Sequence, residues 1–281
     1  MKYKIVCDSG CDFNEEDRKD PDYIMVPLSL TVGEEEIIDD ATFDQPSFLE
    51  KVAACPECPR SACPAPGAFL EAYIQAGDVD VIFVVTLTQK LSGSFNSAQV
   101  AKQMYEEEGH GKAKIFVIDS RSAATAETLI AFELKRLMKE ELPLREVMHR
   151  ISDFRREMVT MFTLENIETF RKNGRMNGVT FFMANALNIK LVLYAHHGEI
   201  AKYTQATGMK KALDKMIERF ALEVKEPEKK VLGITHCNCL ERAEEVRDKI
   251  LNRIPFASVY IVNGAGVSSL YANQGGIIIT A

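Results

Sequence analysis

Short apolar runs alternate with amphipathic segments through the first half of the chain. The clearest run, at 79–87 (VDVIFVVTL), is almost continuously apolar and rich in β-branched residues, which is typical of a central parallel strand covered on both faces. Similar runs at 2–7 and 114–118 predict neighbouring strands, and amphipathic segments at 94–108 and about 124–138 predict the helices that follow. This strand–loop–helix order predicts an α/β fold with a doubly wound, mostly parallel sheet.

The region before the central run is less regular. We expect one strand at 25–32 and short helices at 46–54 and 67–76. Between those helices, four prolines fall within residues 55–66. Proline removes a backbone donor and fixes its own φ, so this segment is predicted to be an irregular loop.

The pattern changes after Pro143, and we predict a second α/β domain with a mixed sheet. The chain is therefore divided into an N-terminal domain at 1–154 and a C-terminal domain at 155–281. The expected elements of the second half are helices at 144–157, 165–172, 179–187, 209–223 and 240–252, and strands at 159–163, 189–194, 202–204, 230–236, 257–262 and 276–280.

Three polar clusters follow predicted strands directly. They lie at 8–12, 88–94 and 119–122. In a doubly wound sheet, ligands bind beyond the carboxyl ends of the strands. We therefore expect these clusters to converge on a ligand site.

Composition and charge narrow the classes of function. The chain has 281 residues, 46% hydrophobic and 27% charged, with a net charge of −7, which is the balance of a globular protein. An acidic chain without a basic run is a poor match for nucleic acid or an anionic membrane surface. No apolar stretch approaches the roughly 18 residues of a membrane span, and the N-terminus does not resemble a signal peptide. We expect a cytoplasmic protein.

Seven cysteines in a long chain of this kind predict reduced thiols rather than a disulfide framework. Cys55, Cys58, Cys237 and Cys239 offer four thiolates for a zinc site. The second pair is separated by a single residue, short of the usual two to four, so the spacing does not favour a metal.

Two enzyme classes can be tested against short motifs. The glycines at 109, 111, 264 and 266 do not complete a dinucleotide fingerprint, and no nucleotide-binding Gly-Lys-Ser/Thr sequence is present. Segment 91–97 (LSGSFNS) lacks the Gly-x-Ser-x-Gly of a serine hydrolase. We therefore assign Ser92, before Gly93, to a ligand and Ser94 to the cap of the following helix. Arg175, beyond a predicted helix end, is assigned to an anion or a partner.

Several segments in order along the chain resemble the bacterial DegV family of fatty-acid-binding proteins. They are 5–9 (IVCDS), 60–67 (RSACPAPG), 91–98 (LSGSFNSA), 117–123 (VIDSRSA), 164–175 ending in FRKNGR, and 187–190 (LNIK). The resemblance implies a two-domain fold with one long-chain fatty acid buried between the domains. It also implies that the protein is a carrier without catalytic residues, cofactor or metal, which presents the acyl carboxylate to a separate ATP-dependent fatty acid kinase.

The resemblance also implies the residues of the site. Ser61 matches the family's loop hydroxyl, and Ser92 with the amide of Gly93 matches its second donor to the carboxylate. Arg175 matches the arginine at the carboxylate and kinase surface, and Tyr271 is expected to approach from the second domain as a neutral hydroxyl donor.

The sequence departs from the family pattern at three places. Ala62-Cys63 replaces Ser-Gln, Tyr271 begins a segment where many members carry His-Thr-Gly-Pro-Gly, and Ala206 or Thr207 replaces an arginine. Loss of a histidine and an arginine weakens the stabilisation of a carboxylate, so acyl binding is better supported than a kinase partner. Two alternatives stay open: an acyl hydrolase using Ser92 or a cysteine as nucleophile, and a lipid-sensing regulatory module.

Overall fold

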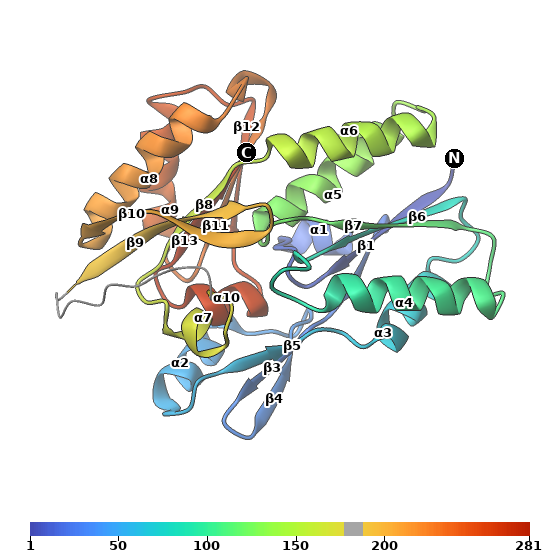
Figure 1. Ribbon diagram of the computed structural model, residues 1–281, viewed down its shortest axis with the longest axis horizontal. Coiled ribbons are helices and arrows are strands. Elements are labelled where there is room, and N and C mark those ends of the chain that lie inside the picture. The colour runs from blue at the N-terminus through green and yellow to red at the C-terminus, as the bar shows by residue number, and fades with distance from the viewer. Residues whose placement is uncertain (177–187) are drawn as a thin grey trace.

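A four-stranded parallel sheet forms the core of the N-terminal half of this computed structural model, which describes residues 1–176 and 188–281 (Figure 1). The strand order is β2-β1-β6-β7, with β2 at Tyr23–Val26, β1 at Tyr3–Asp8, β6 at Val81–Thr86 and β7 at Lys114–Asp119. Every residue of β6 is buried. The predicted central strand is therefore confirmed.

Helices cover both faces of this sheet, as a doubly wound fold requires. Successive side chains of a strand point to opposite faces. Val84 packs with α3 (Pro66–Gln75) and α4 (Ser94–Glu107), whereas Val85 packs against the opposite helices. Those helices are α5 (Thr125–Met138) and α6 (Leu144–Glu157).

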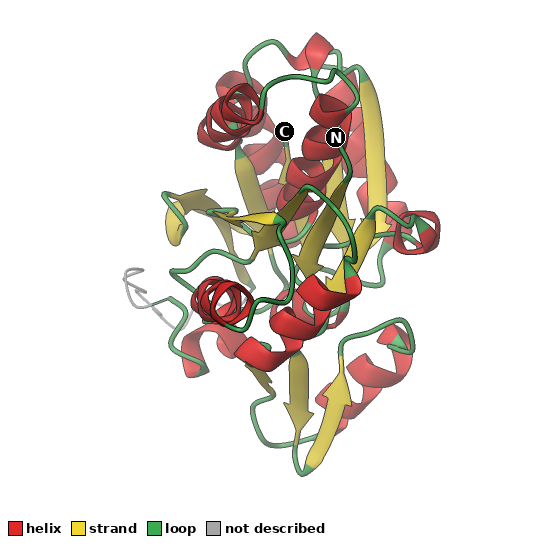
Figure 2. Cartoon of the chain, turned by 90° about the vertical axis from the view of Figure 1, so that its right-hand side faces the viewer, coloured by secondary structure: helices red, strands yellow, loops and turns green. Residues whose placement is uncertain are grey.

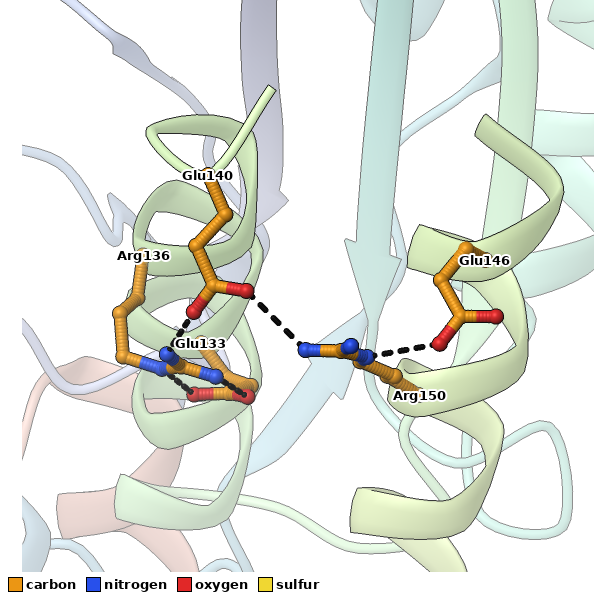
Figure 3. A network of polar contacts seen from close by, with 5 residues as sticks. All are labelled: Glu133, Arg136, Glu140, Glu146 and Arg150. Atoms are coloured by element: carbon orange, nitrogen blue, oxygen red, sulfur yellow. Dashed lines mark hydrogen bonds and ion pairs between the residues drawn. The ribbon is translucent and has the colours of Figure 1, made fainter. Parts of the chain in front are cut away.

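An ion-pair network joins the exposed sides of α5 and α6 (Figure 3). Arg136 forms two hydrogen bonds of 2.7 Å with Glu133 and pairs with Glu140. Arg150 bridges Glu140 at 3.0 Å and Glu146 at 2.9 Å. The network lies outside the apolar core that holds the two helices on the sheet.

A six-stranded mixed sheet forms the second half, in the order β10-β9-β8-β13-β11-β12. Only the β11–β12 pair is parallel among its pairings. The strands are β8 Thr160–Thr163, β9 Ile189–His196, β10 Glu199–Thr207, β11 Val231–His236, β12 Ser258–Asn263 and β13 Ile277–Thr280. One face packs on α8 (Met209–Glu223) and α9 (Leu240–Leu251). The predicted α/β class, with one parallel and one mixed sheet, is confirmed.

A third, three-stranded sheet corrects the prediction for residues 25–32. The expected single strand is two strands, because Pro27 lies between β2 and β3 (Ser29–Val32) and cannot donate to a ladder. β3 pairs with β4 (Glu35–Ile38) and with β5 (Arg60–Ala62), so a strand also runs inside the predicted irregular loop. Both views show the β3–β4 hairpin projecting at one end of the molecule (Figures 1 and 2).

The remaining helices are short. α2 is at Gln45–Ala54, and α7, at Glu168–Lys172, begins three residues later than predicted. Two helices were not predicted: α1 (Glu15–Lys19), capped by Asn14, and α10 (Gly266–Ala272). A 3₁₀ turn lies at Pro227–Lys229. The helix predicted at 179–187 lies outside the described residues.

The apolar core that positions the site joins the three-stranded and the six-stranded sheets. Leu30 of β3, Leu193 of β9 and Leu270 of α10 belong to one buried cluster, and α10 lies centrally between the sheets (Figure 1). The division of the chain into domains at 1–154 and 155–281 stays a prediction. Within the described ranges, the structure has no helix with the length and apolarity needed to cross a membrane.

Candidate functional site

An apolar cavity lies where the two large sheets and α10 meet. The volume open to the centre of a water-sized sphere is about 160 Å³, which suits a slender ligand. Its apolar wall comes from strands and loops of both halves of the chain, including Leu28, Leu87, Phe162, Ile200 and Ile278. Among the described lining residues, the charged side chains are Arg175 and Glu199, and Glu199 pairs with Lys90 at 3.7 Å.

Two hydroxyl groups meet on the cavity wall. Ser61 is the central residue of β5 and lies opposite Leu30 of β3. Its Oγ is 3.0 Å from the Oη of Tyr271 on α10. The Tyr271 ring packs on Phe170, with centroids 4.7 Å apart. Antiparallel pairing on one side and ring packing on the other therefore hold both hydroxyls toward the cavity.

The loop between β6 and α4 contributes Ser92 and Gly93 to the same cavity. Ser92 Oγ accepts from the Ser94 amide at 3.2 Å and lies 3.0 Å from Ser94 Oγ. The expectation that Ser94 caps α4 is wrong. Gly93 occupies the cap position, and Ser94 is already the first helical residue, with a buried side chain that makes no capping bond.

Arg175 also lines the cavity. Its Nη1 donates to the Asn173 carbonyl at 2.5 Å and its Nε to the Leu91 carbonyl at 3.5 Å. Asn173 in turn donates to the Pro59 carbonyl at 2.9 Å, beside the start of β5. These contacts connect the arginine to the segments that carry Ser61 and Ser92. All five predicted site residues line the same cavity.

Sequence analysis did not assign Cys63 to the site, yet this exposed thiol lines the cavity. A Cβ added at Gly93 would lie 2.7 Å from Cys63 Sγ. Glycine at 93 therefore allows the two loops to approach closely. No local signal could have identified this pairing, because it joins segments of two different loops.

Two buried carboxylates fix the helix that carries Tyr271. Asp39 accepts from the amides of Gly266 at 2.6 Å and Val267 at 2.8 Å, and Asp12 accepts from the Ala265 amide at 2.7 Å. These donors lie at the start of α10. Burial raises the pKa of both Asp12 and Asp39 to about 6, although their hydrogen bonds act in the opposite direction.

The cysteine pairs do not form a metal site. Cys237 Sγ faces the Ser269 carbonyl, and Cys239 Sγ faces the Gly276 carbonyl, whereas Cys58 contacts Asn173. Within 1–176 and 188–281, no three cysteine, histidine or acidic side chains are grouped to hold a metal. All seven cysteines lie in these ranges and are free thiols, as predicted.

Comparison with known proteins identifies the family. Residues 2–280 match the family model described as DegV. The chain belongs to the DegV family. A DegV domain-containing protein of Streptococcus gordonii is 34% identical over 282 residues, which cover 99% of this chain and 98% of the relative. The resemblance seen in the sequence is confirmed.

Two solved DegV-family structures are similar over the whole chain. A Ruminococcus gnavus protein, described with vaccenic acid, has 39% identity and a TM-score of 0.95, covering 100% of this chain and 99% of its own. The Streptococcus pneumoniae fatty acid kinase (Fak) B3 protein, described as loaded with linoleic acid, has 30% identity and a TM-score of 0.87, with coverage of 100% and 99%.

In this DegV-family chain, some of the residues that depart from the family pattern line the cavity and others do not. Cys63 lines the cavity, whereas Ala62 and Thr207 are not among its described lining residues. Thr207 ends β10 and is exposed, and Ala206 is buried in the core under α8. The residues at 206 and 207 therefore add no donor to the cavity.

Proposed function

We propose that this protein binds one long-chain fatty acid in the apolar cavity and presents its carboxylate to a separate ATP-dependent fatty acid kinase. The carboxylate is bound by Ser61, Ser92, the Gly93 amide and Tyr271, and Arg175 lies beside it at the surface for the partner. The protein is the carrier in this scheme and not the catalyst, and it needs no cofactor or metal.

One observation carries the proposal: an apolar cavity with hydroxyl donors on its wall and, among its described lining residues, Arg175 as the one cation. Each methylene group moved from water into such a cavity contributes roughly 0.8 kcal/mol. A carboxylate taken out of water needs hydrogen-bond donors, since an unpaired buried charge costs several kcal/mol. An amphiphile with a long alkyl chain and one acidic head group satisfies both requirements.

The similar solved structures support the ligand class. Those from Ruminococcus gnavus and Streptococcus pneumoniae are described with vaccenic and linoleic acid, both long-chain fatty acids. The kinase partner is supported by the second of these, which is named as a fatty acid kinase protein. Arg175 agrees with that role because it is a cation at the head-group end that forms no ion pair among the described residues.

The hydrolase alternative is less well supported. A serine nucleophile needs an adjacent base, and Ser92 Oγ hydrogen-bonds to the amide and the hydroxyl of Ser94. All five histidines lie within the described residues, and none lines the cavity. A lipid-sensing module would use the same cavity with a different partner. We assign the protein to the cytoplasm, which agrees with seven free thiols.

Native mass spectrometry of the purified protein tests the proposal. We expect a mass increment that matches a long-chain fatty acid, loss of this increment after delipidation, and saturable one-to-one binding of added palmitate or oleate. Absence of both retained and added lipid would refute fatty-acid binding. Hydrolysis of p-nitrophenyl acyl esters by wild type but not by Ser92→Ala would instead favour the hydrolase.

A further inference from the structure

A second cavity adjoins the apolar one and is unlike it in character. The two share Ser122, Thr160 and Ala195 as lining residues. The second cavity lies among β8–β10, the turn after β7 and the C-terminal ends of α6 and α8, and its water-accessible volume is about 570 Å³. That volume is within the range of small-molecule sites in proteins.

Positive charge is concentrated in this second cavity. Its described lining includes five cationic side chains and one carboxylate, Glu223, in a chain of net charge −7. Two of the cations form ion pairs, Arg219 with Glu223 and Arg156 with Asp153. The other three are Arg121, Arg155 and Lys202.

Arg155 is the most informative of these cations. Its Nη1 donates to the main-chain carbonyl of Asp119 at 2.7 Å, but its Nε is buried without a hydrogen-bond partner. The Asp119 carboxylate is engaged elsewhere, by Gln89 and by the Arg121 amide. Arginine stays charged in proteins, and the one carboxylate whose charge favours this half-buried guanidinium, Asp119, forms no ion pair with it. The buried Nε therefore has a donor left for an anion.

Arg121 adds a second guanidinium to the same place. Arg121 and Arg155 line the same cavity. Burial lowers the pKa of Arg155, the positive charge of Arg121 lowers it further, and the Asp119 carboxylate raises it. Arg121 has a φ of +55° in the turn after β7, a backbone conformation that costs energy for a residue with a side chain. Neither arginine forms an ion pair with another described residue.

We propose that the second cavity binds the phosphate group of a small phosphorylated molecule, with Arg121 and Arg155 as its main ligands and Lys202 at the rim. A guanidinium presents two parallel N–H donors that match phosphate oxygens, and two guanidiniums balance a dianion. A nucleotide and a phosphorylated lipid head group share this chemistry, and the cavity is large enough for either. The proposed phosphate ligands are different residues from the proposed donors to the fatty acid, although the two cavities share Ser122, Thr160 and Ala195.

Isothermal titration calorimetry at constant ionic strength tests the site with three probes: inorganic phosphate, glycerol 3-phosphate and adenosine monophosphate. We expect saturable one-to-one binding of at least one probe. Arg155→Ala and Arg121→Ala should each weaken it by roughly tenfold or more, and Arg155→Lys should recover only part of the affinity. Arg247→Ala, on the exposed side of α9, removes the same charge elsewhere and should change the affinity less than twofold.

The outcomes separate the sources of the phosphate. Preference for glycerol 3-phosphate supports a head group, preference for adenosine monophosphate supports a nucleotide, and equal binding of all three supports recognition of the phosphate alone. The proposal is overturned if no probe gives saturable heat up to about 10 mM, or if both arginine variants bind like wild type. It is also overturned if Arg247→Ala loses as much as they do. Because Arg121 is exposed, its variant remains informative should Arg155→Ala fail to fold.

Discussion

The hydroxyl oxygens of Ser61 and Tyr271 lie 3.0 Å apart, although 210 residues separate them in the chain. One belongs to a three-residue edge strand and the other to a seven-residue helix. Each is a neutral donor that can turn its hydrogen toward a third oxygen. The pair therefore provides two donors to a bound carboxylate without a buried charge of its own.

Removing either hydroxyl should weaken fatty-acid binding. We expect Ser61→Ala and Tyr271→Phe each to cost about 1–3 kcal/mol, because a buried acceptor is left short of a donor. The two hydroxyls contact each other, and in the proposed function both bind the same carboxylate. The double variant should therefore lose less than the sum of the single losses. Titration of delipidated protein with oleate measures all three. Additive losses would mean that the two hydroxyls do not act on one head group.

Alanine substitutions at Ser92 and Arg175 should have different effects on fatty-acid binding. Ser92→Ala should weaken oleate binding by about 1–3 kcal/mol, for the same reason as at Ser61. Arg175→Ala should leave oleate binding mostly intact, because the Arg175 guanidinium donates to the main-chain carbonyls of Leu91 and Asn173. The variant should impair phosphorylation of the bound acid by a partner kinase. If Arg175→Ala abolishes binding, the arginine and not the serines holds the carboxylate.

The sequence predicted some parts of this molecule well and others poorly, for physical reasons. The buried strand at Val81–Thr86 was evident because a strand covered on both faces is apolar throughout. β3 was merged with β2 into one expected strand, because apolar residues continue on both sides of Pro27, and β5 was missed because a three-residue strand is too short to show periodicity. Ser61, Ser92, Gly93 and Arg175 were predicted as site residues through family motifs, and Tyr271 through a departure from one. Cys63 lines the cavity because two loops meet, which no local pattern encodes.

Replacing Gly93 by alanine, the smallest side chain, should already weaken fatty-acid binding. A methyl group there would lie 2.7 Å from Cys63 Sγ, so in Gly93→Ala either the exposed Cys63 thiol rotates away or the loop that also carries Ser61 shifts. Overpacking of this kind typically costs about 1–3 kcal/mol, and we expect weaker oleate binding in titration. The matched double variant, Gly93→Ala with Cys63→Gly, removes the clash and should restore much of the affinity. Failure of this rescue would show that the glycine acts through its backbone and not through the thiol.

The ion-pair network between α5 and α6 should contribute little to stability (Figure 3). The side chains of Arg150 and Glu140 are 43% and 37% exposed, and pairs in water are screened and lose side-chain entropy on forming. Arg150→Ala should therefore barely move the urea midpoint. Leu134→Ala, a fully buried position on α5, should cost about 2–5 kcal/mol. A comparable loss from both would show that the network holds the helices together.

The two carboxylates that hold α10 should make stability depend on pH. Burial raises the pKa of Asp12 and Asp39 to about 6 in the folded protein, above the value of about 3.9 in an unfolded chain. The folded state therefore binds the proton more tightly. Protonation of the two carboxylates therefore stabilises the folded protein. This contribution is fully present below pH 3.9 and is lost as the pH rises through 6. His236 opposes this trend, because burial lowers its pKa and its contribution is lost as the pH falls.

Comparison of wild type with Asp39→Asn isolates one carboxylate from these opposing effects. The asparagine variant should be less stable at every pH, because its amide group cannot accept from both the Gly266 and Val267 amides. Between pH 5 and 7, however, wild type should lose about 1 kcal/mol more of its free energy of unfolding than the variant does. Urea unfolding at pH 5, 6 and 7 measures this difference in slope, and His236 contributes equally to both proteins. Parallel curves would mean that Asp39 stays ionised throughout and that its hydrogen bonds to α10 outweigh the cost of its burial.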